Sequence, residues 1–170
     1  MSVLPCRRAL ILLTLLEISL PMPVAVAQVA GCPSEDIELS TQAEVDAFQA
    51  DFGNGGICSA LTDSLTIRGP DITNLNGLSE ITSVGGVLNI VTNDNLTNLD
   101  GLGGITSVGG DLVVGGNPAL TNLDGLNGVT SVGSTLEIAL NASLTNLDGL
   151  SGITSVEGIL QIKNNVTIAN

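Results

Sequence analysis

The sequence predicts a mainly β solenoid, a chain wound into stacked coils of about 24 residues, with one helix covering its N-terminal end. The first observation is a repeated heptapeptide. LTNLDGL begins at Leu96, Leu120 and Leu144, and the looser copy ITNLNGL begins at Ile72, so the four start positions are 24 residues apart. The second is a companion phrase, ITSVGG or a close variant, which recurs at the same step from Ile81 onward. A unit of this length cannot bury an apolar face alone and stacks on its neighbours.

The N-terminal segment has the pattern of a secretory signal peptide, predicted over residues 1–27. Arg7 and Arg8 precede an apolar run over residues 9–16, and Ala25 and Ala27 supply the small residues that a signal peptidase reads. An apolar run this short does not span a bilayer, which takes about 20 residues. We expect the mature chain to be secreted or held at the cell surface, without insertion into the membrane.

Two cysteines remain once Cys6 leaves with the signal peptide, and they support two interpretations. Cys32 and Cys58 flank the predicted helix, and in an oxidising compartment such a pair is most simply a structural disulfide. Alternatively, Val29-Ala30-Gly31-Cys32 resembles the lipobox of bacterial lipoproteins, in which the Cys is acylated and anchors the protein. That alternative leaves Cys58 as a free thiol.

Residues 31–63 are predicted to form an N-terminal cap. Ile37 and Leu39 alternate with acidic residues in a short strand pattern, and Thr41 followed by Glu44 forms a capping box that starts a helix. Its apolar residues are Val45, Phe48 and Phe52, and Gly53 is expected to end it in the left-handed conformation. Such an atypical terminal unit covers the apolar interior that the end of a solenoid exposes.

Residues 64–170 are predicted to form the repeats, each opening with a short strand that sends its first and third residues inward. The five triplets are Leu65–Ile67, Leu88–Ile90, Leu112–Val114, Leu136–Ile138 and Leu160–Ile162. Their middle residues, expected to face solvent, are Thr66, Asn89, Val113, Glu137 and Gln161. Asn93, Asn117, Asn141 and Asn165 follow the later triplets at a fixed distance, and the first unit has Pro70 there.

The rest of each unit supplies two further sides and the corners between them. In the second unit, Leu96 and Leu99 of the LTNL phrase, with Ile105 and Val108 of the ITSV phrase, are expected to face inward. Glycines that follow Asn or Asp, at positions 77, 101, 125 and 149, are predicted turn residues that tolerate positive φ. The paired glycines at 85–86 and 109–110 mark another corner.

These phrases resemble a known family. The L-x-[IV]-x-x-N phrase is the core of a leucine-rich repeat. Together with the GCP-x-x-DI-x-L start and a helix between two cysteines, it resembles bacterial receptor L-domain-like proteins, relatives of the ligand-binding L domains of insulin and growth-factor receptors. The resemblance covers Gly31 to the C-terminus. It implies a right-handed β-helix with leucine-rich-repeat character, a disulfide-tied N-terminal cap, extracellular placement and, by analogy, ligand recognition.

One departure from that family concerns the last repeat. In these domains a terminal cap usually follows the repeats, whereas here Leu160, Ile162, Val166 and Ile168 are followed by Asn170 and the sequence stops. We therefore expect the final coil to lack a C-terminal cap, and its open edge offers a route to self-association.

One column of carboxylates is the candidate site for both catalysis and calcium binding. Asp100, Asp124 and Asp148 occupy equivalent positions, which places them about 4.8 Å apart, close to the separation of about 5.5 Å in retaining glycosidases. A repeat produces such columns automatically, however, and the chain has no His and no aromatic platform for a sugar. We predict no enzyme, no catalytic residues and no cofactor. Calcium is the alternative for this column, although no EF-hand loop or calcium-binding nonapeptide is present.

The composition and the predicted fold favour two functions, which are recognition of a ligand and a purely structural role. The 170 residues suggest one domain, and 17 acidic against 4 basic residues give a net charge of −13, which repels nucleic acids and anionic lipids. We expect a non-enzymatic extracellular module that recognises an unidentified protein or glycan through the outward strand residues, with Thr97, Thr121 and Thr145 on a neighbouring face. The alternative is a structural or adhesive repeat module without a specific ligand, because Trp, Tyr and Arg, which dominate binding hot spots, are missing from these faces.

Overall fold

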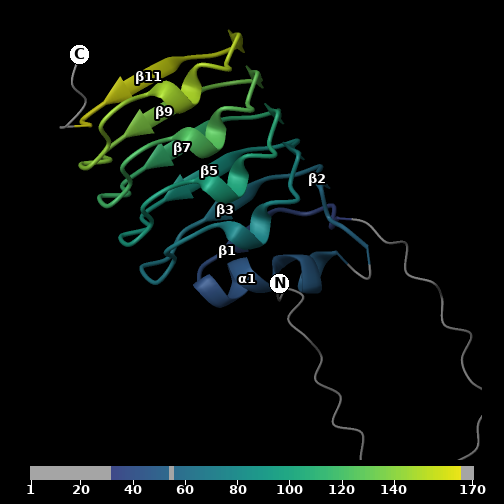
Figure 1. Cartoon of the computed structure of the whole chain (residues 1–170). Helices are drawn as coiled ribbons and strands as arrows, with labels where there is room; N and C mark the ends of the chain where they lie inside the picture. Colours follow the sequence, from purple (N-terminus) through teal and green to yellow (C-terminus); the bar gives the residue numbers. More distant parts are fainter. Residues whose placement is uncertain (1–31, 54–55, 166–170) are drawn as a thin grey trace, which may run out of the picture.

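The computed structural model describes residues 32–53 and 56–165, and the described chain winds as a stack of parallel coils (Figure 1). The predicted signal peptide, residues 1–27, lies outside the described residues, as do most of the lipobox and residues 166–170. The predicted fold class is confirmed at the level of a mainly β, solenoid-like fold. Its strands are parallel and lie in two sheets, with the same strand and turn pattern in successive coils.

The first sheet, called sheet A, has six strands, all parallel and in sequence order. They are β1 (Ile37–Leu39), β3 (Leu65–Ile67), β5 (Leu88–Val91), β7 (Leu112–Gly115), β9 (Leu136–Ala139) and β11 (Leu160–Lys163). Their register aligns the equivalent leucines, since Leu65 pairs with Leu88, Leu88 with Leu112, and so on to Leu160. The first and third residues of β3, β5, β7 and β9 are buried, as predicted.

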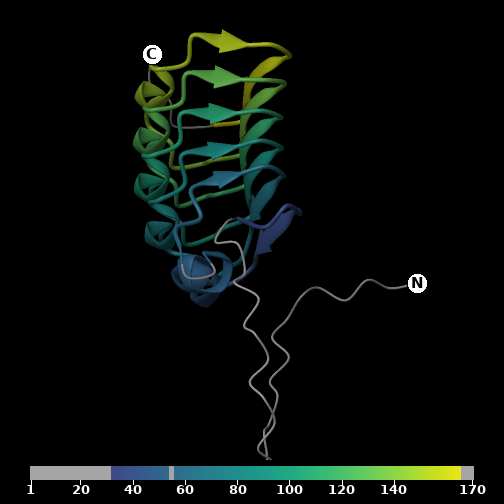
Figure 2. The same ribbon diagram turned by 90° about the vertical axis from the view of Figure 1, so that its right-hand side faces the viewer.

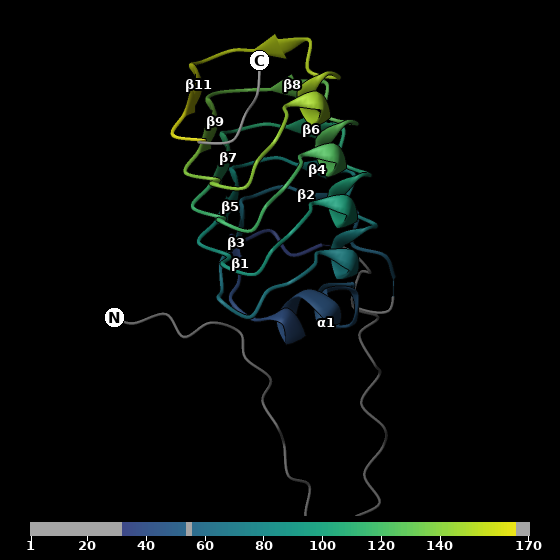
Figure 3. The same ribbon diagram turned by 60° about the vertical axis from the view of Figure 1, so that its left-hand side comes forward.

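The second sheet, called sheet B, has five two-residue strands in an equally regular order. They are β2 (Ala60–Leu61), β4 (Ser83–Val84), β6 (Ser107–Val108), β8 (Ser131–Val132) and β10 (Ser155–Val156). A column of short 3-10 helices stacks along another side of the coils (Figure 3), namely η1 (Asn76–Leu78), η2 (Asp100–Leu102), η3 (Asp124–Leu126) and η4 (Asp148–Leu150). The sequence pattern did not predict these helices.

The repeated heptapeptide has a structural role for six of its seven residues, as the copy from Leu120 to Leu126 shows. Its three leucines are fully buried. The N–H and hydroxyl of Thr121 both donate to the Thr97 carbonyl of the preceding coil, at 3.1 Å each. Asn122 Oδ1 accepts the N–H of Asp124 at 3.0 Å and so starts η3. Only the carboxylate of Asp124 is left to solvent, and Gly125 meets the backbone of the preceding coil at Leu99.

The prediction that the Asp-Gly glycines adopt positive φ is wrong. Gly116, with φ 66°, is the one glycine among the described residues with positive φ. Gly125 is required for a different reason, because a Cβ there would collide with the carbonyl oxygen of Leu99 in the neighbouring coil. The same close approach to the preceding coil occurs at Gly101 and Gly149, and Gly77 lies equally close to the Val45 carbonyl of the N-terminal helix. Glycine at this position therefore permits coils to stack closely.

Positive φ occurs instead at the corner that follows each strand of sheet A, at the residue just before Asn93, Asn117, Asn141 or Asn165. Thr92, Leu140 and Asn164 have φ of 54°, 60° and 57° there, and Gly116 is their equivalent. This conformation turns the chain out of sheet A and directs the following Asn into the interior. Residues other than glycine are uncommon in this conformation, which costs about 1–2 kcal/mol, so the corner is held by the bonds of the asparagine that follows.

Buried asparagines join the coils through a ladder of hydrogen bonds. Asn117 Nδ2 donates to the Ile90 carbonyl at 3.0 Å, and the backbone N–H of Asn117 donates to Asn141 Oδ1 at 3.2 Å. Equivalent bonds link Asn93 to Asn117 and Asn141 to Asn165. Because Asn93, Asn117 and Asn141 are fully buried, these bonds satisfy backbone groups that no water reaches.

The ladder begins at Gly69, and the expectation that Pro70 holds this position is corrected. Gly69 donates its N–H to Asn93 Oδ1 at 2.9 Å, as each later Asn does to the next. The reason is a shorter corner. Leu65 pairs with Leu88, 23 residues further on, whereas Leu88 pairs with Leu112, 24 residues further on.

The N-terminal end is covered by α1 (Gln42–Phe52), which starts with the predicted cap. Thr41 Oγ1 accepts the N–H of Glu44 at 3.2 Å, and the Glu44 carboxylate accepts the N–H of Ser40 at 2.8 Å. Val45 and Phe48 are fully buried, and the ring of Phe52 lies 5.1 Å from that of Phe48. Figure 2 shows α1 lying across the end of the stack.

The expected left-handed ending of this helix is wrong. Gly53 has φ −70° and ψ −15°, an ordinary right-handed conformation, and its N–H donates to the Gln49 carbonyl. A Cβ on Gly53 would collide with the carbonyl oxygens of Gln49 and Gly56. Lack of space, and not backbone handedness, therefore explains the glycine.

We predict that Asn117→Ala lowers the free energy of unfolding by about 3 kcal/mol, because each buried polar group left unpaired costs about 1–3 kcal/mol. The groups left unpaired are the Ile90 carbonyl and the Asn93 donors that use Asn117 Oδ1. Urea unfolding followed by circular dichroism measures the loss. The control is Asn127→Ala, at an exposed position, which should change stability by no more than about 0.5 kcal/mol. Equal stability of the two variants would contradict a structural role for the ladder.

A second prediction compares two glycines of neighbouring coils. Gly125→Ala should lower the free energy of unfolding by about 1–3 kcal/mol or more, because the added methyl group overlaps the Leu99 carbonyl. Gly103→Ala should leave stability unchanged or raise it by about 0.4–1 kcal/mol. Gly103 has φ −60° and is exposed, so alanine fits its backbone without a clash. Thermal unfolding of both variants measures the difference, and a destabilised Gly103→Ala would refute the explanation by close approach.

The cap should also make stability depend on pH through Glu44. The backbone N–H of Ser40 holds the pKa of the Glu44 carboxyl below its ordinary value of 4.5. A lowered pKa in the folded state means stabilisation that is present above the unfolded value and is lost as pH falls through the folded value. Glu44→Gln should therefore cost about 0.3–1 kcal/mol at neutral pH, and the difference should shrink in acid. A difference independent of pH, measured by urea unfolding, would contradict this role of the charge.

Candidate functional site

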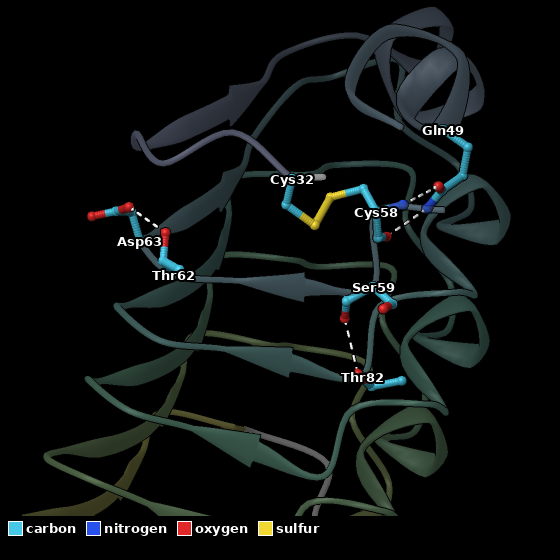
Figure 4. Close-up of a disulfide and its surroundings, with 7 residues drawn as sticks. All are labelled: Cys32, Gln49, Cys58, Ser59, Thr62, Asp63 and Thr82. Atoms are coloured by element: carbon cyan, nitrogen blue, oxygen red, sulfur yellow. Dashed lines mark hydrogen bonds between the residues drawn. A yellow bond between two sulfur atoms is a disulfide. The ribbon is translucent and has the colours of Figure 1, made fainter. Parts of the chain in front are cut away.

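The predicted disulfide is confirmed, since the sulfurs of Cys32 and Cys58 are bonded (Figure 4). The two residues are 26 apart in sequence and 4.7 Å apart between Cα atoms. Gln49 of α1 holds the same corner, because its side chain accepts the Cys58 N–H and donates to the Cys58 carbonyl, both at 2.9 Å. The bond therefore ties the segment before β1 to the segment that enters β2. A Cys32 sulfur in this bond has no valence left for the acyl chain of a lipoprotein.

The acidic column keeps its carboxylates in solvent. Asp100, Asp124 and Asp148 each begin a 3-10 helix, and each side chain is exposed. Among residues 32–53 and 56–165, no three His, Cys, Asp or Glu side chains come close enough together to hold a metal ion. The observed role of these residues is the start of a turn. The structure thus adds no support to the calcium alternative.

Another acidic residue has a structural role at the corner before β7. Asp111 Oδ1 accepts the backbone N–H of Thr135 in the next coil at 2.8 Å. The Ser134 hydroxyl, together with that N–H, holds the pKa of the Asp111 carboxyl below its usual range. This carboxylate therefore joins two successive coils.

Two threonine columns are committed to structure as well. On the side that leads into sheet B, the Thr106 hydroxyl donates to the Thr82 carbonyl at 3.2 Å, and Thr130 bonds to Thr106 in the same way at 3.1 Å. The predicted neighbouring face of Thr97, Thr121 and Thr145 is exposed, and the hydroxyls of Thr121 and Thr145 donate to the preceding coil in the same way. Their hydroxyls keep acceptor capacity only, which limits what these columns offer to a ligand.

The outer face of sheet A differs from coil to coil. Its middle column, in register, consists of Glu38, Thr66, Asn89, Val113, Glu137 and Gln161. The five residues predicted to face outward are all in this column, and each is partly exposed. By contrast, the outer side of sheet B carries the same residues in successive coils. A shallow groove of about 430 Å³ runs along it, with Ser83, Ser107 and Ser131 among its lining residues. Of the two sheets, sheet A therefore has the more variable outer face.

Both cations of the described residues lie at this face. Arg68 follows β3 directly and its Nε contacts Glu38 Oε1 at 2.6 Å, and Lys163 on β11 places Nζ 3.0 Å from Glu137 Oε1. The Lys163 and Glu137 side chains are 44% and 29% exposed, so this is a surface ion pair, worth at most about 1 kcal/mol. The face consequently carries charges of both signs near its ends and neutral residues between them.

The sequence pattern did not predict these cations at the face, and the expectation that the outward faces lack Arg is wrong for Arg68. The signal was available, because Arg68 and Lys163 each lie three residues after the leucine that opens a strand, Leu65 and Leu160. Residues at this phase form a second column, in which Val91, Gly115, Ala139 and Lys163 pair in register. The pattern was easy to miss because the coils between them have small or apolar residues there.

Comparisons with protein-family models, with curated proteins and with solved structures found no match. Within the described part of the chain, no helix is long and apolar enough to cross a membrane.

Proposed function

We propose that the chain is a non-enzymatic extracellular recognition module of the receptor L-domain-like kind, which binds a protein or glycan through the outer face of sheet A. In this proposal the stack is a right-handed β-helix with leucine-rich-repeat character, coils of about 24 residues and one capping helix. The Cys32–Cys58 disulfide supports extracellular placement, because such bonds persist in oxidising compartments.

The observation that carries the proposal is the contrast between the faces. The interior leucines, the asparagine ladder and the threonine columns repeat because coil stacking requires them. The middle column of sheet A has no such requirement, and it changes from Thr66 to Asn89, Val113, Glu137 and Gln161. A constant scaffold that presents a variable sheet is the arrangement by which repeat proteins recognise partners.

The chemistry of the face indicates the kind of partner. Asn89, Glu137 and Gln161 offer hydrogen-bond donors and acceptors, and Val113 provides an apolar centre. Because the chain has a net charge of −13 and both cations at the face already contact carboxylates, anionic partners are disfavoured. The face has no Trp or Tyr, so we expect a neutral or basic polar surface to be bound with modest affinity.

A structural or adhesive module without a specific ligand is the second candidate. The observation that favours it is the uniformity of sheet B and the threonine columns, which make the module rigid and soluble without offering a distinctive surface. In that case the variation on sheet A reflects only freedom from structural constraint.

The test uses two variants that add the same side chain in the same coil. Val113→Arg places a long cation at the centre of the sheet A face, and Asn127→Arg places it at an exposed position on the 3-10 side. Binding of the wild type and both variants to an array of glycans and extracellular proteins is measured. We expect Val113→Arg to lose at least about tenfold in affinity, or about 1.4 kcal/mol, for the partner that the wild type and Asn127→Arg bind equally.

Either of two outcomes would contradict the recognition role. If Val113→Arg binds as well as the wild type, the outer face of sheet A is not the binding surface. If the wild type binds no member of the array, the structural module is the better description.

A further inference from the structure

Within residues 32–53 and 56–165, no element covers the end of the stack opposite α1. Leu160 and Ile162 of β11 are 60% and 41% exposed, whereas their equivalents in the preceding coil, Leu136 and Ile138, are 2% and 0% exposed. Ile159, at the corner before β11, is 66% exposed. The side chains that form the core elsewhere therefore form a surface here, at the end where β11 lies in Figures 1 and 2.

This end is also concave. A hollow of about 380 Å³ has Leu136, Leu147, Leu150, Ile153, Val156 and Leu160 among its lining residues. Leu147, Leu150, Ile153 and Val156 are only partly covered and Leu160 is exposed, because no further coil lies on them among the described residues. β11 pairs with β9 on one side, and its other edge has no partner strand in the described chain. The end thus combines an apolar hollow with an unpaired strand edge.

We propose that this end binds the same end of a second copy of the chain, forming a two-fold symmetric dimer. The opposite end supplies the first argument, because α1 covers it and Val45 and Phe48 are fully buried there. A head-to-tail stack would have to place the open coil against that covering helix. End-to-end contact between two open coils needs no rearrangement, and a two-fold interface of this kind closes at two copies.

The size of the surface fits a dimer. Stable interfaces use about 20–30 residues on each side, and one coil, from Leu88 to the residue before Leu112, has 24 residues. One complete end coil against another therefore gives an interface of ordinary size. Its apolar hollow also resembles the apolar centre that homodimer interfaces have.

The distribution of charge also favours contact through this end of the stack. Residues 144–165 contain only Asp148, Glu157 and Lys163 as charged groups, a small share of a chain whose net charge is −13. Two copies therefore repel least when their open ends meet. A two-fold axis perpendicular to sheet A runs the two β11 strands antiparallel, so that their unpaired edges meet. This pairing continues sheet A across the dimer.

The test measures the mass of the whole secreted chain by light scattering and by sedimentation equilibrium over a range of concentration and salt. We expect twice the chain mass, and more dimer at higher salt, because salt screens the repulsion between two acidic chains. Leu160→Glu should give the chain mass only. Ile57→Glu is the matched control, since Ile57 is 65% exposed but lies near the capped end, and it should remain dimeric.

Circular dichroism shows whether each variant is folded. If Leu160→Glu does not fold, Ile159→Glu replaces it, because that side chain is still more exposed. The proposal is overturned by a wild-type chain that stays monomeric at every concentration. Assemblies that grow beyond two copies, or a folded Leu160→Glu or Ile159→Glu variant that still dimerises, would overturn it as well. Because the contact does not use the outer face of sheet A, its failure would leave the proposed recognition function untouched.

Discussion

The structure depends on one constraint, which is that buried polar groups at the corner of each coil must be paired. Asn93, Asn117 and Asn141 satisfy it by bonding to the preceding and the following coil at once. An asparagine that slipped by one residue would lose its partners on both sides and leave backbone groups unpaired in a dry interior. The constraint therefore fixes the register of every coil against its neighbours, and the exact sequence period follows from it.

This fixed register determines which residues are free to differ. Inward leucines fill the core, threonine hydroxyls donate to the preceding coil, and Gly125 leaves room for the Leu99 carbonyl. After these demands are met, the outer columns of sheet A remain. The outer columns of sheet A vary from coil to coil and carry both cations of the described residues, whereas most positions that face the core or bond to a neighbouring coil repeat. A recognition surface and a surface that is merely unconstrained would both arise there, and binding distinguishes them.

The two ends of the stack differ in how far their apolar side chains are covered. A coil that has no neighbour exposes a slice of the core, and the N-terminal slice is covered by α1, with Phe48 inserted into the core. The Cys32–Cys58 bond and the Gln49 side chain hold the flanking segments against that end. At the other end, Leu160 and Ile162 face outward in a region of low charge. Solenoid stability is a sum over neighbouring coils, so the open end is where a partner adds most.

The sequence by itself determined the period, the inward leucines and valines, the asparagine positions after the first unit and the capping box at Thr41. It favoured the pairing of Cys32 with Cys58, and the structure decided between that pairing and the lipobox alternative. Each of these features follows from a short local pattern or from the recurrence of that pattern along the chain. The tertiary structure alone decided why Gly125 is glycine and that Gly69 starts the ladder. These features depend on distances between residues of different coils, which arise only when the coils stack, and residue order along the chain does not specify them.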